Sequence, residues 1–214
     1  MNTNNIKAVV FDMDGTLLDS REFIYQAMET VLAQYDVAMP RHQLASVTGK
    51  PVRAMYELLV PDLPLDELES AHFAHHAAHE QLLEMYDGAH EVLGELLRRQ
   101  YKLGIFTGFD DRTIDRLRRF ALDSYFDSIS ESSRYKKHKP DPEGLFICMQ
   151  DLGVSPQETA YIGDGVFDML AGKAAGVART IGISHGFASS DELYRTGADM
   201  VIDSLYDVPS AVQG

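Results

Sequence analysis

Several features that would assign a protein to a specialised class are missing from this sequence. Cys148 is the single cysteine among 214 residues, so no disulfide can form within the chain, which is typical of a reducing compartment. No apolar run approaches the ~20 residues that span a membrane. Residues 1–5 lack the basic and apolar regions of a secretion signal. We therefore expect a cytoplasmic protein with no membrane partner.

Positive charge is also scarce. The 19 lysine and arginine residues face 33 aspartate and glutamate residues, which gives a formal net charge of -14. Because nucleic acids are bound by clustered lysine and arginine, we expect no nucleic-acid partner. An anionic substrate would need a local source of positive charge to overcome this field.

Strand and helix signals alternate along much of the chain. Residues 6–11 form a β-rich apolar run that predicts a buried parallel strand. Further strands are expected at residues 102–106, 126–129, 159–162, 178–183 and 200–202, and helices at residues 90–99, 112–120, 142–152 and 167–176. This alternation predicts an α/β fold with a doubly wound, mainly parallel, Rossmann-like sheet.

The stretch that follows the first strand has a different character. Up to about residue 86 it carries helical spacing and no convincing strand, and we expect helices from Ser20 to residue 35, at residues 52–60 and at residues 65–85. This is too long for a crossover between strands. We therefore predict an α-helical cap at residues 18–86, inserted into a core of residues 1–17 and 87–214.

Two aspartates follow the first strand, in Asp-Met-Asp-Gly-Thr at residues 12–16. In an extended segment, residues two apart point the same way, so Asp12 and Asp14 can share one face. Such a pair suits a nucleophile and a general acid/base. The same residues also suit an acidic turn.

Three more motifs follow later strands. Thr107 and Gly108 offer a hydroxyl and an amide for phosphoryl oxygens. Lys139, in a proline-flanked basic loop, supplies positive charge, and Asp164 and Asp168 suit a hard cation. Each motif alone fits a turn, a solvated loop or a helix cap. Because open α/β sheets place their sites at the carboxyl ends of strands, the four motifs together indicate one site.

The four motifs resemble those of the haloacid dehalogenase superfamily of phosphatases, and the match covers essentially the whole chain. The helical insertion looks like the cap of the phosphoglycolate phosphatase and β-phosphoglucomutase branch. The resemblance implies that Asp12 attacks phosphorus and forms an aspartyl-phosphate, while Asp14 serves as general acid and then base. Thr107, the Gly108 amide and Lys139 would hold the phosphoryl oxygens.

The resemblance also implies Mg²⁺ as cofactor. Asp12, Asp164 and the backbone carbonyl of Asp14 would be its protein ligands. Asp168 would either ligate the metal directly or orient Lys139.

The implied activity is that of a phosphoglycolate phosphatase-like phosphomonoester hydrolase acting on a small phosphorylated metabolite. A β-phosphoglucomutase-like sugar-phosphate mutase is the first alternative, followed by a pyrophosphatase and a phosphonoacetaldehyde hydrolase. Lys50 and Thr107-Gly108-Phe109 fit the phosphonate hydrolase, but that family lacks the second aspartate, Asp14. A non-catalytic metabolite-binding protein would be expected to have lost Asp12 or Asp14. The sequence is compatible with both a monomer and a homodimer.

Two groups in the cap have open interpretations. Lys50 and Arg53 would bind an anionic leaving group or would be exposed charges at a helix start. His72, His75, His76 and His79 have the spacing of one helix face. That spacing permits a transition-metal site, but we favour a solvated face or one that meets the core domain.

Overall fold

The computed structural model describes residues 6–108 and 112–213. The expectations for residues 1–5 and for Phe109 lie outside the described residues. Within these ranges, no helix is long and apolar enough to cross a membrane.

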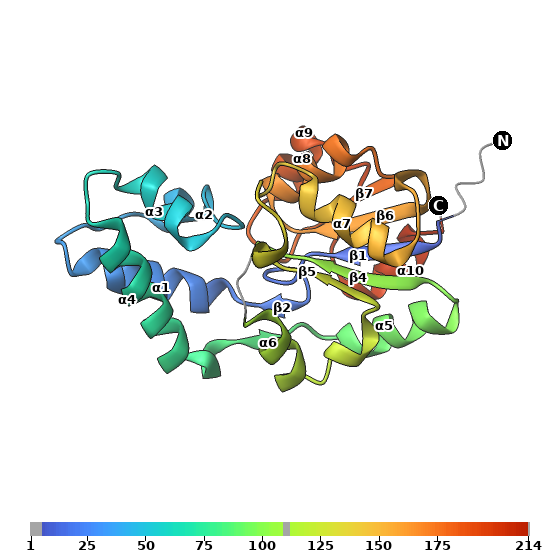
Figure 1. The fold of residues 1–214 in the computed structure, drawn as a ribbon, viewed down its shortest axis with the longest axis horizontal. Coiled ribbons are helices and arrows are strands. Elements are labelled where there is room, and N and C mark those ends of the chain that lie inside the picture. The colour runs from blue at the N-terminus through green and yellow to red at the C-terminus, as the bar shows by residue number, and fades with distance from the viewer. Residues whose placement is uncertain (1–5, 109–111, 214) are drawn as a thin grey trace.

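A six-stranded parallel sheet forms the centre of the larger domain (Figure 1). In spatial order the strands are β5 (Ser128–Ser130), β4 (Lys102–Phe106), β1 (Ala8–Phe11), β6 (Thr159–Gly163), β7 (Arg179–Ile183) and β8 (Met200–Ile202). After β1 the chain builds β4 and β5 on one side and then β6, β7 and β8 on the other. This confirms the doubly wound sheet and makes β1 its switch point.

Helices cover both faces of the sheet. One face carries α5 (Ala89–Arg98), α6 (Thr113–Arg119) and α10 (Val208–Ala211), and the other carries α7 (Glu143–Leu152), α8 (Val166–Ala175) and α9 (Ser190–Thr196). Along β1, Val9 and Phe11 pack towards α5, whereas Ala8 and Val10 pack towards α7 and α8. This burial on both faces explains why the strand is a continuous apolar run.

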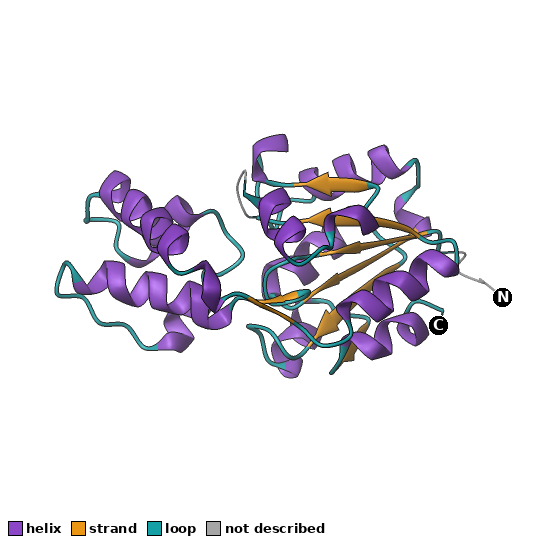
Figure 2. Cartoon of the chain, turned by 90° about the horizontal axis from the view of Figure 1, so that it is seen from below, coloured by secondary structure: helices purple, strands orange, loops and turns teal. Residues whose placement is uncertain are grey.

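A helical cap lies to one side of the sheet (Figure 2). It consists of α1 (Arg21–Ala33), α2 (Arg41–Ala45), α3 (Val52–Leu59) and α4 (Leu65–Ala78). These helices enclose an apolar core of their own, with Phe23, Met28, Leu44, Tyr56 and Leu68 among its buried members. Two short antiparallel strands, β2 (Leu18–Asp19) and β3 (Glu84–Met85), join the cap to the core.

The expected helix at residues 65–85 is wrong at its end. It stops at Ala78, and a 3₁₀ turn and β3 follow. β3 also contradicts the expectation of no strand before residue 86. A two-residue strand carries no period of its own, and β3 exists because it pairs with β2 more than sixty residues earlier. Helices α2, α9 and α10 were not expected. The 3₁₀ turn after α4 spans Glu80–Leu82, and further 3₁₀ turns lie at Asp123–Tyr125, Ser132–Arg134, Pro156–Glu158 and Leu205–Asp207.

Candidate active site

The carboxyl ends of β1, β4 and β6 deliver Asp12, Thr107 and Asp164 to one edge of the sheet. Asp12 directly follows β1, and its backbone N–H donates to the carbonyl of Ile162 at 2.8 Å. This bond extends the pairing of β1 with β6 by one residue. The Asp12 backbone is thereby fixed, and the residue is only 7% exposed.

Lys139 reaches this edge from the loop before α7. Its Nζ donates to Oδ1 of Asp12 at 2.6 Å and to Oδ1 of Asp168 at 2.7 Å. The side chain is buried, although the neighbouring Lys136 and Lys137 are exposed. The basic loop is therefore solvated except for the one cation that enters the site.

Asp168, at the start of α8, is held by three donors. Besides Lys139, the hydroxyl of Tyr161 donates to its Oδ1 at 2.7 Å and the backbone N–H of Gly165 donates to its Oδ2 at 2.9 Å. Sequence reasoning missed Tyr161, which stands in a strand that looks like core throughout. The hydrogen bond from Lys139 to Asp168 is compatible with one of the two roles considered for Asp168, that of orienting Lys139.

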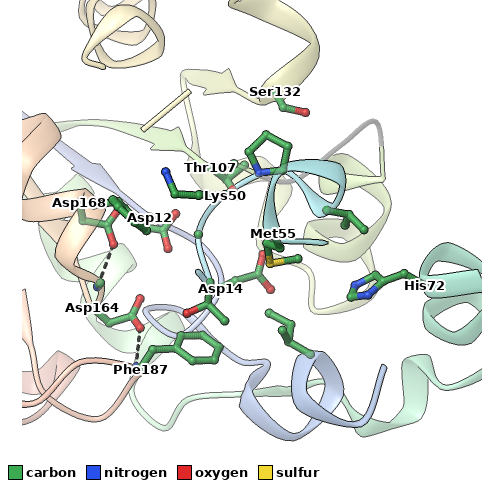
Figure 3. Close-up of a pocket in the computed structure, with 18 of the residues that line it drawn as sticks. Asp12, Asp14, Lys50, Met55, His72, Thr107, Ser132, Asp164, Asp168 and Phe187 are labelled. Carbon is green, nitrogen blue, oxygen red and sulfur yellow. Dashed lines mark hydrogen bonds between the residues drawn. The ribbon is translucent and has the colours of Figure 1, made fainter. Parts of the chain in front are cut away.

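Asp164 follows β6 and accepts two hydrogen bonds. Thr16 Oγ1 donates to its Oδ1 at 2.9 Å. The backbone N–H of Phe187 donates to its Oδ2 at 2.8 Å (Figure 3). Gly15 and Gly186 press against the same carboxylate, because an added Cβ would lie 2.3 Å and 2.0 Å from Oδ2, respectively. Gly186 and Phe187 were not predicted. The only signal for them was their place in the loop after β7.

Three carboxylates gather with the spacing of metal ligands. Asp12, Asp164 and Asp168 each offer an oxygen within 4.8 Å of the others. Opposite ligands of an octahedral Mg²⁺, at ~2.1 Å each, lie ~4.2 Å apart, so a small contraction would form a ligand set. All three side chains are buried, and oxygen donors suit a hard cation. The Asp14 side chain is outside this group.

The electrostatics of the cluster also fit a cation. Burial raises the pKa of Asp12 well above its usual value; Lys139 opposes this shift, and the carboxylates of Asp168 and Asp164 add to it. Burial, followed by the Asp168 charge, raises the pKa of Asp164 to about 7. Burial alone would lower the pKa of Lys139, but Asp12 and Asp168 raise it, so its ammonium stays charged. The cluster carries more negative charge than Lys139 balances.

A cavity of about 180 Å³ opens over the cluster, between the sheet edge and the cap (Figure 3). Asp12, Asp14, Thr107 and Gly108 border it together with Asp164 and Asp168. Gly108 also allows the core domain to approach the cap closely. A Cβ at this position would lie 2.6 Å from the Gly49 carbonyl oxygen in the cap, so a side chain would not fit. The structure thus brings these six predicted residues to one space, and Lys139 is hydrogen-bonded to two of them without bordering the cavity itself.

The structure places Lys50 and Arg53, the two positively charged cap residues of the predicted site, in different environments. Lys50 borders the cavity, and its Nζ lies 4.0 Å from the centre of the Phe167 ring. Burial lowers the pKa of Lys50. Arg53 is exposed and points elsewhere, where it forms ion pairs with Asp66 and with Glu69, the latter at 3.6 Å. The structure does not bring Arg53 to the cavity.

The four histidines of α4 do not share one environment. His72 and His76 are fully buried in the cap, with ring centres 4.2 Å apart. His75 and His79 are partly exposed and stack on each other at 4.0 Å. A single solvated face is therefore wrong for His72 and His76.

A Rossmann-like sheet with an aspartate–lysine–aspartate chain at its carboxyl edge, beneath a helical cap, defines a class of capped α/β hydrolases. The model of the haloacid dehalogenase-like hydrolase family matches residues 9–182 of this chain, so the chain belongs to that family. The resemblance stated from the motifs is confirmed, and the enzyme is a phosphatase of this family.

Individual relatives match over nearly the whole length. A pyrophosphatase PpaX of Halalkalibacterium halodurans is 31% identical over 206 residues, 95% of each chain. A phosphorylated carbohydrates phosphatase of Thermotoga maritima is 29% identical over 199 residues, 90% of this chain and 92% of the other. The crystal structure of a hydrolase from Pseudomonas syringae shares the fold, with a TM-score of 0.88, 24% identity and 97% coverage of both chains.

Proposed function

We propose that the protein is a Mg²⁺-dependent phosphomonoester hydrolase that acts on a small phosphorylated metabolite through an aspartyl-phosphate on Asp12. The position of Asp12 carries this proposal. Its carboxylate lies at the end of β1, 2.6 Å from the Lys139 ammonium, and borders the cavity. A carboxylate so placed can attack a phosphoryl group whose negative oxygens the ammonium offsets.

The reaction would proceed in two displacements. In the first, an Asp12 oxygen bonds to phosphorus, the bond from phosphorus to the leaving oxygen breaks, and Asp14 gives that oxygen a proton. In the second, Asp14 takes a proton from water as the water oxygen attacks the aspartyl-phosphate. The bond to Asp12 then breaks, which releases phosphate and restores the carboxylate. Thr107 and the Gly108 amide, which border the cavity, would hold the phosphoryl oxygens throughout.

Mg²⁺ would be held by the carboxylates of Asp12 and Asp164, with the Asp14 backbone carbonyl as a further ligand. Bound there, it would offset the charge of the phosphoryl group and of the surrounding carboxylates. Asp168 already accepts three hydrogen bonds, which supports its role as the residue that orients Lys139.

The leaving group would be selected by the cap, residues 18–86. A cavity of about 180 Å³ suits a small metabolite, since pockets for drug-sized ligands span ~300–1,000 Å³. Pyrophosphate is the second candidate substrate, because the Halalkalibacterium relative is named a pyrophosphatase and Lys50 borders the cavity. A sugar-phosphate mutase would differ by being activated by a sugar bisphosphate and regenerating it.

The test is the hydrolysis of a panel of phosphate monoesters and pyrophosphate by the wild type and by Asp12→Asn. We expect a loss of more than about 10³-fold in kcat, together with dependence on added Mg²⁺. Asp62→Asn, at an exposed position of the cap, is the matched control and should keep full activity. Undiminished hydrolysis by Asp12→Asn would refute the covalent mechanism. A requirement for catalytic sugar bisphosphate would favour the mutase.

A further inference from the structure

The cavity has two chemically different ends. Figure 3 shows Asp12, Asp168 and the Lys50 amine on one side and His72 on the opposite side. Apolar cap side chains also line the cavity: Ile24, Val52, Met55 and Phe73. A phosphoryl group belongs at the charged end, where the nucleophile is. The leaving group must then extend towards His72.

His72 presents an unpartnered polar atom at this far end. The residue is 0% exposed, and its Nδ1 is hydrogen-bonded to the Tyr56 hydroxyl at 2.9 Å. Its Nε2 is buried and has no hydrogen-bond partner among the residues that the structure describes. The ring extends from α4 towards Met55 and the cavity (Figure 3). Since buried polar atoms in folded proteins are almost always hydrogen-bonded, an unpartnered nitrogen on a side chain that borders a cavity suits a ligand.

The imidazole of His72 is uncharged at neutral pH. Burial, with smaller contributions from His75 and Arg116, lowers its pKa to about 3. A neutral imidazole offers either one donor or one acceptor at Nε2, and a hydroxyl group can match both because it donates and accepts. Glu69 also borders the cavity, with Arg53 3.6 Å from it, whereas Lys50, the one lysine or arginine among the described residues that line the cavity, lies at the charged end (Figure 3). This end therefore favours an uncharged hydroxyl over a second phosphate.

We propose that His72 is a specificity-determining residue whose Nε2 hydrogen-bonds a hydroxyl group of the leaving group. The preferred substrate is then the phosphate monoester of a small hydroxylated carbon skeleton, that is, a polyol or sugar phosphate. This inference rests on the proposed phosphomonoester hydrolysis and assigns its substrate class.

The test compares three substrates: glycerol 3-phosphate, ethyl phosphate, which lacks the hydroxyls, and pyrophosphate. In the wild type we expect kcat/KM for glycerol 3-phosphate to exceed that for ethyl phosphate by about 10- to 100-fold, the usual effect of one buried hydrogen bond to substrate. His72→Leu should lose most of this preference, chiefly through KM, and should change kcat/KM for ethyl phosphate by less than about threefold.

Two further variants separate hydrogen bonding from packing. His72→Gln keeps a polar group at the cavity wall and should retain part of the preference for glycerol 3-phosphate. His75→Leu changes a histidine of the same helix that is stacked on His79 and does not border the cavity, and it should behave as the wild type.

A spectroscopic measurement keeps the inference testable even if His72→Leu does not fold. In Asp12→Asn protein with ¹⁵N-labelled histidine, glycerol 3-phosphate should shift the His72 Nε2 resonance, whereas inorganic phosphate should not. Equal responses to both would overturn the inference, as would an equal loss for all substrates in folded His72→Leu or a wild-type preference for pyrophosphate. A wild type that hydrolyses none of the substrates would instead refute the proposed function.

Discussion

Single glycines decide where the Asp164 carboxylate lies. Gly186, in the loop after β7, leaves room that even one methyl group would fill, because the added Cβ would lie 2.0 Å from Oδ2. The next residue, Phe187, gives that same oxygen a hydrogen bond from its backbone N–H. The loop therefore both makes room for the carboxylate and fixes it in place.

Gly186→Ala should accordingly weaken the metal site. The new methyl group would overlap the Asp164 carboxylate and displace it, and disturbance of the groups around a metal ligand typically costs ~10–100-fold in affinity. We expect the Mg²⁺ concentration for half-maximal activity to rise by that factor. Gly94→Ala in α5 is the control, because its Cβ meets only ordinary contacts, the nearest at 3.6 Å. An unchanged Mg²⁺ activation curve in Gly186→Ala would contradict the assignment.

Asp12, Asp164, Asp168 and Lys139 were predictable because each stands in a compact motif, at or just after a strand end or, for Lys139, in a proline-flanked basic loop. Tyr161 and Gly186 were not, because their roles depend on partners that only folding brings near. The same holds for Arg53: its pairing with Asp66 sets its direction, and no local pattern reveals that.

At the scale of elements, the histidine spacing in helix α4 predicts a shared helix face but does not show whether that face is exposed or buried. Its buried residues are Leu68, His72 and His76, spaced four apart, so two histidines complete a stripe that the cap core requires. The sequence shows the spacing, but histidine suits a surface as well as a core. In the structure, the Phe23 ring stacks on His76 at 3.9 Å and the Tyr56 ring contacts His72. These contacts place both histidines in the cap core.

Burial of His72 predicts an acid-sensitive cap. Unfolded histidine takes up a proton near pH 6.5, whereas the pKa of native His72 is lowered to about 3. Between these values the unfolded state binds more protons, so the contribution to stability is present above pH 6.5 and is lost as pH falls. Relative to the wild type, His72→Leu should therefore gain about 2 kcal/mol between pH 7 and pH 5.

Urea unfolding of both proteins at the two pH values, with Mg²⁺ held constant, measures this difference. His75→Leu serves as the comparison, because His75 is partly exposed. A stability difference between His72→Leu and the wild type that does not change with pH would show that the pKa of His72 is not lowered in the native state.

At the scale of the whole molecule, the net charge of -14 contrasts with the need to bind an anionic group. The contrast is resolved locally, by the buried ammonium of Lys139 and by the carboxylate cluster that we propose holds Mg²⁺. The charge of the whole chain then affects solubility and the choice of binding partners, while the charged groups of the site determine the local electrostatic field there.

Because Asp12, Asp164 and Asp168 repel one another, Mg²⁺ should stabilise the whole fold. At 100 times its Kd, a ligand specific for the native state adds ~2.7 kcal/mol, which corresponds to a rise in Tm of roughly 5–10 °C for a chain of this size. Calorimetry with Mg²⁺ and with EDTA measures the rise. Asp164→Asn should lose most of it and Asp62→Asn should keep it; an equal rise in both variants would place the metal elsewhere.

The sequence by itself determined the sheet, the insertion of a helical cap and the acids and lysine of the site. Each of these depends on short-range signals: apolar runs, strand-end motifs and helical spacing. Only the tertiary structure decided which histidines are buried, that Arg53 points away from the cavity, and that β2 and β3 pair. The physical reason is the same in each case. These features depend on contacts between residues far apart in the chain, and such contacts leave no local period in the sequence.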